Sequence, residues 1–235
     1  MGESIFTPVI SRTAFDETLN RLESAIKLGL LPPGSRLPAE RELCTQLGIS
    51  RSTLRQALMT LTASGYLHAT RGRGGGTFVV DSPPAVGPPS KEDLAGWRDV
   101  CDERIATELG VVALAASRAT PESLVPVERI AAELEKFPDP IRTCQLERQF
   151  HIAIAELTNS RRLILASTAI QASIFDVMST VVPTDEQREF GNNSHRAIIA
   201  ALANSDQQGA IHAMCAHLGE TVTLFDEEPA SHPAR

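Results

Sequence analysis

The stretch SRSTLRQALMTL, residues 50–61, decides the fold of the N-terminal part of the chain. Its apolar residues recur at the spacing of an amphipathic helix; they are Leu54, Ala57, Leu58 and Leu61. Ser50 is a favourable N-cap, so we expect the helix to begin just after it and to run toward Gly65. Arg51 and Arg55 are four residues apart and share a face roughly opposite the apolar stripe. Because that face cannot be core, the arginines face either solvent or a ligand.

The flanking residues complete a small domain. Residues 12–31 carry a second helical stripe of apolar residues, and a short helical segment ends at Gly48, placed as a C′ residue would be. Residues 65–80, GYLHATRGRGGGTFVV, are two β-prone runs around a glycine-rich turn, which predicts a hairpin. Three helices with a tight turn between the second and third, followed by a hairpin, predict a winged helix-turn-helix domain over residues 1–80.

The sequence changes character after residue 80. The stretch DSPPAVGPPSKED holds four prolines and a glycine, and residues 81–91 are therefore expected to be a linker. Residues 92–226 have almost no strand pattern and predict an all-α bundle of about six helices, with residues 227–235 as a tail. The fold class predicted for the whole chain is mainly α.

Charge is distributed unevenly between these parts. The whole chain carries −7 at pH 7, yet residues 1–80 hold nine Lys and Arg against six Asp and Glu, a balance of +3. The remainder holds thirteen against twenty-three, a balance of −10. A basic small domain joined to an acidic larger one favours a nucleic-acid contact that is confined to the N-terminal domain.

Cysteine usage and hydropathy indicate the cellular compartment of the protein. The four cysteines are scattered without paired spacing, which suits a reducing environment. The N-terminus lacks the features of a signal peptide, and no apolar run approaches the roughly 20 residues of a membrane span. We therefore expect a cytoplasmic protein with no membrane partner.

The second helix of a helix-turn-helix offers its N-terminal residues to the major groove of DNA. There a guanidinium can bond two acceptors of guanine, and short hydroxyls near the helix start can hold phosphate. The residues expected to contact double-stranded DNA are Arg41, Arg51, Ser52, Thr53, Arg55, Arg71, Gly72 and Arg73. Arginines on exposed helix faces are often simply solvated, which is the alternative for each one alone. A phosphate loop is disfavoured because a strand follows the glycine-rich turn.

Residues 13–79 resemble the GntR family of bacterial transcriptional regulators, above all in LPPGSRLPAERELCTQLGISRSTLRQALMTLTASGYLHATRGRGGGTFV. The resemblance implies DNA contacts by Arg41, Arg51 and Arg55, with wing-tip contacts by Arg71 and Gly72. It also implies a homodimer that binds a palindromic operator, since two-fold operators mirror the symmetry of the protein.

The helical half contains an arrangement typical of a metal site. Glu147 and His151 are four residues apart on one helix face. His195 and His217 lie at similar heights if their two helices form an antiparallel hairpin. Three imidazoles and one carboxylate suit a divalent ion such as Zn²⁺ or Ni²⁺, or Mn²⁺ with added water ligands. The alternative for each histidine alone is a hydrogen-bonded or surface residue.

Residues 92–226 resemble the FadR-type C-terminal ligand-binding domain (FCD) of many GntR regulators. His151, His195 and His217 match the metal-binding pattern of that domain, whereas Glu147 stands where the family usually has Asp. Residues 97–120 resemble its first helix, which implies that Arg104 and Glu108 face an effector pocket. The implied effector is a small organic or sugar acid, which a guanidinium and a metal can both hold. The alternative for Arg104 and Glu108 is a surface ion pair.

We therefore expect a homodimeric repressor or activator whose effector, bound beside the metal, alters operator affinity. A second hypothesis makes the metal purely structural and the helical domain a dimerisation unit. A metal-dependent enzyme is disfavoured, because the chain has no HExxH motif and no evident nucleophile paired with a base.

Overall fold

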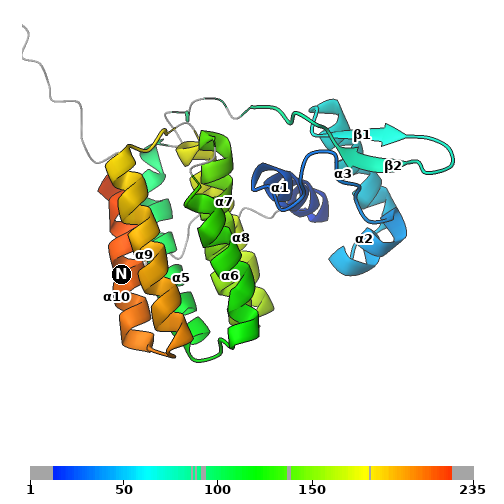
Figure 1. Cartoon of the computed structure of the whole chain (residues 1–235). Coiled ribbons are helices and arrows are strands. Elements are labelled where there is room, and N and C mark those ends of the chain that lie inside the picture. The colour runs from blue at the N-terminus through cyan, green and yellow to red at the C-terminus, as the bar shows by residue number, and fades with distance from the viewer. Residues whose placement is uncertain are drawn as a thin grey trace, which may run out of the picture. The chain divides into compact units, whose positions relative to one another are not determined.

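The structure is a computed structural model of the chain that describes residues 13–85, 87, 89–90, 94–136, 139–179 and 181–223. It divides into two compact units, residues 1–84 and 85–235, each with its own core (Figure 1). The expected linker, residues 81–91, spans this division, and the expected tail, residues 227–235, lies outside the described residues. The described residues are mostly helical with one small hairpin, so the predicted fold class is confirmed.

The first unit has the elements of a winged helix. In chain order they are α1 (Ala14–Lys27), α2 (Glu40–Leu47), α3 (Arg51–Ala63), β1 (Leu67–Thr70) and β2 (Gly76–Val79). The strands pair antiparallel, with Leu67 opposite Val79. Gly48 ends α2 in the left-handed conformation (φ 68°), which glycine adopts without a steric cost. Ser50 then caps α3, because its Oγ accepts the backbone N–H of Thr53 at 3.1 Å.

The apolar stripes seen in the sequence form the core of this unit. Leu54, Ala57, Leu58 and Leu61 of α3 are all buried. The three leucines belong to a core with residues from α1, α2 and both strands, among them Leu22, Ile26, Leu43, Leu67 and Val79. Burial of α3 on this side leaves its opposite face, which carries Arg51 and Arg55, exposed.

The second unit is a bundle in which the structure describes six principal helices. They are α5 (Trp97–Ala116), α6 (Pro121–Leu134), α7 (Pro140–Leu157), α8 (Arg161–Met178), α9 (Asp185–Ala203) and α10 (Gln207–Thr223). Local capping fixes the start of several of them: Thr120 and Thr184 form capping boxes, and Asp139 caps α7 before a proline at its first position. Helix α10 packs on α5 and α9, and α7 packs on α5, α6 and α8.

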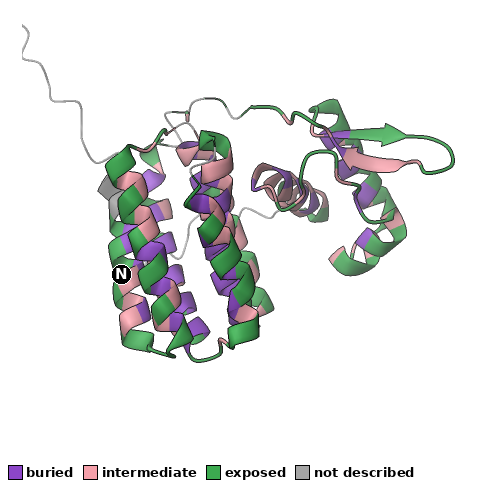
Figure 2. Ribbon diagram, viewed as in Figure 1, coloured by how far each residue is buried: buried purple, intermediate pink, exposed green. Residues whose placement is uncertain are grey.

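Helix α7 is largely covered by its neighbours, and this covering determines the environment of the candidate site. Buried residues occur on several of its faces, and six in succession, residues 150–155, are buried. Figure 2 shows the buried residues of the bundle along the faces that its helices turn toward one another. Polar side chains on α7 are therefore enclosed by neighbouring helices.

None of the described helices is long and apolar enough to cross a membrane.

Candidate functional site

The first unit presents its predicted DNA-contacting residues on the surface. Arg41, Arg51, Ser52 and Arg55 are exposed, and Thr53 is half-buried. Arg55 Nε donates to Glu40 Oε2 at 2.9 Å, and both side chains remain largely in solvent. A surface pair of this kind contributes little to stability, so it can be exchanged for a contact with DNA.

Short hydroxyls gather at the N-terminus of α3. The Ser50 Oγ lies 2.8 Å from Ser52 Oγ and 2.8 Å from Thr53 Oγ1. The partial positive charge of a helix N-terminus and its unpaired backbone N–H groups favour an anion at this position. The arrangement can hold a phosphate while the exposed arginines reach base edges.

The wing turn is shaped by its glycines and by one arginine that the sequence analysis missed. Arg71, Gly72 and Arg73 are exposed in this turn, and Gly72 requires a positive φ of 97°. Arg36 Nη2 donates to the carbonyl oxygen of Gly75 at 2.6 Å, and its guanidinium lies 6.0 Å from the centre of the Phe78 ring. Arg36 therefore supports the wing from 39 residues away, and no local sequence pattern signals such a contact.

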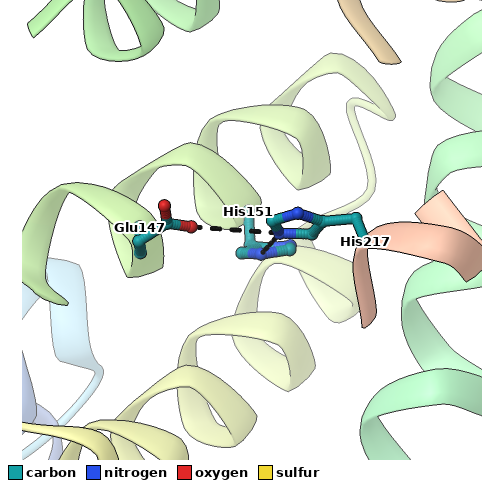
Figure 3. A group of neighbouring side chains, drawn as sticks. All are labelled: Glu147, His151 and His217. Carbon is teal, nitrogen blue, oxygen red and sulfur yellow. Dashed lines mark hydrogen bonds and ion pairs between the residues drawn. The ribbon is translucent and has the colours of Figure 1, made fainter. Parts of the chain in front are cut away.

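The second unit brings the predicted metal ligands together (Figure 3). The ligand atoms of Glu147 and His151, from α7, and of His217, from α10, all lie within 4.8 Å of one another. His151 Nε2 is 3.2 Å from His217 Nε2, and His217 Nε2 is 3.9 Å from Glu147 Oε2. His195, from α9, completes the cluster: its Nε2 is 3.2 Å from Glu147 Oε2, and its ring centre is 4.8 Å from that of His217.

Neighbouring acceptors determine which ring nitrogens carry protons. Ser194 donates its single hydroxyl hydrogen to the Gly191 carbonyl at 2.7 Å, so His217 Nδ1, 2.8 Å from Ser194 Oγ, is the donor in that pair. His151 Nε2 accepts from Arg104 Nη2 at 2.9 Å, because a guanidinium can only donate, and His151 Nδ1 lies 2.5 Å from Glu108 Oε2. In both histidines the lone pair is therefore on Nε2.

The two Nε2 atoms lie 3.2 Å apart, and that of His151 also accepts from Arg104 Nη2 at 2.9 Å. A metal with bonds of about 2.0–2.1 Å to nitrogen holds neighbouring ligand atoms roughly 3.0–3.4 Å apart in octahedral or tetrahedral geometry. The 3.2 Å between the two Nε2 atoms falls within this range. Ser194 and Glu108 lie beside the opposite ring nitrogens, where hydrogen-bond partners orient histidine ligands in metal sites.

The protonation states suit metal ligation as well. Burial lowers the pKa of His151 to about 4, with a further contribution from Arg104. Burial and the neighbouring imidazoles hold the pKa of His217 well below its usual value. Burial of Glu147 opposes its ionisation, but His195 and His217 outweigh this and lower the pKa of Glu147 below its usual range. Neutral rings beside an ionised carboxylate are the forms that bind a cation.

Arg104 and Glu108 form a buried pair rather than the surface pair that was the alternative. Each is 2% exposed, and Arg104 Nε lies 3.2 Å from Glu108 Oε1. Glu108 also accepts from Gln171 Nε2, and Arg104 Nη2 is 2.9 Å from His151 Nε2. Burial opposes ionisation of Glu108, but His151 and Arg104 lower its pKa to about 2. The pair is therefore part of the support of His151.

A cavity of about 120 Å³ adjoins the cluster. Glu147 and His217 line it, together with Arg148, a buried residue that the sequence analysis missed. The sequence gives only a weak indication that Arg148 is buried: it is a cation within LERQFHIAIAEL, a helical stretch rich in apolar residues. Gln171 and Ser194 were also missed, because each acts through a residue of another helix.

Comparison with known proteins assigns both units. The family "Bacterial regulatory proteins, gntR family" matches residues 15–79, and the FCD domain matches residues 99–220. The chain belongs to the GntR family of bacterial transcriptional regulators. This GntR regulator is 34% identical over 244 residues to the "Putative L-lactate dehydrogenase operon regulatory protein" of Escherichia coli, covering 95% of this chain and 92% of that protein.

Two further comparisons agree with this assignment. The regulator is 30% identical to the "Uxu operon transcriptional regulator" of Escherichia coli, over 79% of this chain and 76% of that protein. The solved structure of "E. coli McbR/YncC" has the same fold, with a TM-score of 0.55 at 23% identity, over 92% of this chain and 98% of that one. The chain is thus a DNA-binding transcriptional regulator and not an enzyme, as predicted.

Proposed function

We propose that this regulator holds a divalent metal ion through Glu147, His151, His195 and His217, and that a small carboxylate bound beside the ion modulates operator binding. The observation that carries this proposal is the convergence of Glu147, His151 and His217, whose ligand atoms all lie within 4.8 Å of one another. His195 Nε2, 3.2 Å from Glu147 Oε2, adds a third imidazole to this group.

Charge balance supports an anionic effector. The charged groups near the cluster are two arginines, Arg104 and Arg148, and two carboxylates, Glu108 and Glu147, of which all but the half-buried Glu147 are buried. With neutral imidazoles these charges cancel, so a divalent ion leaves a surplus of two positive charges in a buried site. Uncompensated charge in a low-dielectric interior is costly, and a bound anion reduces that cost.

The cavity limits the size of the effector. Its volume of about 120 Å³ is smaller than the cavity of about 150 Å³ that accepts benzene. This favours a small acid. The relative named for an L-lactate dehydrogenase operon makes a small 2-hydroxy acid the first candidate. The metal, Zn²⁺, Ni²⁺ or Mn²⁺, would act as a Lewis acid that holds the carboxylate.

Control of DNA binding follows from linkage. We propose a homodimeric repressor or activator on a palindromic operator, in which each first unit reads one half-site with α3. The acid alters operator affinity only to the extent that it binds one arrangement of the dimer more tightly than the other. A purely structural metal is the competing possibility, because the cluster joins α7, α9 and α10 and an ion there would cross-link the three helices.

Native mass spectrometry and DNA binding together test the proposal. We expect one metal ion per chain in a dimer, and loss of that ion in His151→Ala and His217→Ala. Fluorescence anisotropy with DNA from upstream of the regulator's own gene should show sequence-specific, salt-dependent affinity that a small acid changes. A metal-free dimer with all three histidines present would refute the proposed metal site. Metal-loaded protein whose operator affinity no acid alters would favour the structural role.

A further inference from the structure

We propose that Arg148, rather than Arg104, is the residue that binds the effector carboxylate. This inference rests on the proposed function and names the contact on which acid recognition depends. Arg148 lies in α7, directly after the metal-ligand candidate Glu147, and lines the cavity next to Glu147 and His217.

The guanidinium of Arg148 is buried with donors that no protein group uses. Arg148 is 4% exposed, and its Nε and Nη1 have no hydrogen-bond partner within the part of the chain that the structure describes. A buried cation with unsatisfied donors is unfavourable unless an anion pairs with it. A guanidinium at the wall of a cavity matches the planar, two-oxygen geometry of a carboxylate.

Other groups at the cavity do not use the free donors of Arg148. Glu147 Oε2 is already engaged with His195 at 3.2 Å. Cys144 lies one turn before Arg148 and lines the same cavity, but burial raises the pKa of its thiol to about 11. The thiol is therefore neutral at pH 7, and the free donors of Arg148 are left for a ligand.

Arg104, in contrast, is occupied by protein groups. Its Nε pairs with Glu108 at 3.2 Å, and its Nη2 lies 2.9 Å from His151 Nε2. It is not among the residues that line the cavity in the described part of the chain. Arg104 is therefore a positioning residue for Glu108 and His151, whereas Arg148 faces the space that a ligand can enter.

The rest of the cavity wall indicates the class of acid. Apolar side chains also line it, among them Leu134, Met178 and Val181. Polar side chains are contributed by Gln187 and Asn192 of α9. A short monocarboxylate fits this wall, with its carboxylate on Arg148 next to the metal cluster and its carbon chain on the apolar side.

The test measures acid binding by the full-length, zinc-loaded protein. Glycolate, L-lactate, pyruvate and malonate are titrated by calorimetry into the wild type, Arg148→Gln and Arg148→Met. Methionine is similar in length and carries no buried charge, so Arg148→Met keeps the test decisive if the glutamine variant does not fold. The matched control is Arg142→Gln, the same change on the same helix, at a residue that pairs with Glu133 at 2.7 Å outside the cavity lining.

We expect the acid that binds the wild type to bind Arg142→Gln equally well. Both Arg148 variants should bind it roughly 50-fold more weakly, as loss of charge-assisted hydrogen bonds implies. Circular dichroism and zinc content are measured for each variant. Folded, zinc-loaded Arg148 variants that bind the acid within twofold of the wild type would overturn this assignment and leave the proposed function intact. A wild type that binds none of the four acids would refute both.

Discussion

The hydroxyl of Ser194 provides a sensitive test of the metal cluster, because Ser194 is not itself a ligand. Its Oγ accepts from His217 Nδ1 at 2.8 Å and donates to the Gly191 carbonyl at 2.7 Å. In Ser194→Ala the ring of His217 loses the acceptor that keeps its proton on Nδ1 and its Nε2 lone pair toward Glu147 and His151. Loss of one such supporting contact typically weakens metal binding about 10- to 100-fold, or roughly 1.4–2.7 kcal/mol.

The assay is competition for Zn²⁺ between the protein and a chromophoric chelator at pH 7.5. We expect Ser194→Ala to bind one ion per chain with an affinity about 10- to 100-fold lower than that of the wild type. The control is Ser173→Ala, an exposed serine of α8 whose Oγ bonds only the backbone carbonyl of Ala169 among the contacts described. A Ser194→Ala affinity within twofold of the wild type would refute the tautomer argument, as would an equal loss in Ser173→Ala.

Three further predictions concern the DNA surface, acid stability and a turn. Arg51→Ala and Arg55→Ala should each cost about 1–3 kcal/mol in operator binding and relax specificity at one base pair. Fluorescence anisotropy with operator variants that differ at single base pairs measures both effects. An equal loss of affinity for all sequences would mean that the arginine contacts only phosphate. In EDTA-treated protein His151 has a folded pKa of about 4, against 6.5 for an unperturbed histidine. Protonation below pH 6.5 therefore favours the unfolded state. In urea unfolding, the free energy of unfolding should fall by about 2 kcal/mol between pH 7 and pH 5 because of this residue. The fall should be smaller in His151→Gln. Gly48→Ala should lower the free energy of unfolding by about 1 kcal/mol, because alanine is strained at a φ of 68°; an unchanged melting temperature would contradict this.

Local rules were sufficient for the secondary structure. The helix predicted after Ser50 begins at Arg51, the runs around the glycine-rich turn pair as β1 and β2, and Gly48 has the left-handed conformation expected of a C′ residue. These features depend on capping, periodicity and backbone sterics within a few residues. The same rules placed Glu147 and His151 on one face of α7, because residues four apart in a helix are neighbours.

The sequence by itself thus determined the mainly helical fold, the winged helix and the residue types of the candidate site. Only the tertiary structure decided how those residues are used. It brought Glu108 of α5 to His151 of α7, Ser194 of α9 to His217 of α10, and it enclosed Arg148 at a cavity wall. The physical reason is that α7 is largely covered by its neighbours, so its own periodicity does not distinguish a solvated arginine from a buried one. Contacts between helices depend on their relative rotation and height, which packing of the whole bundle determines.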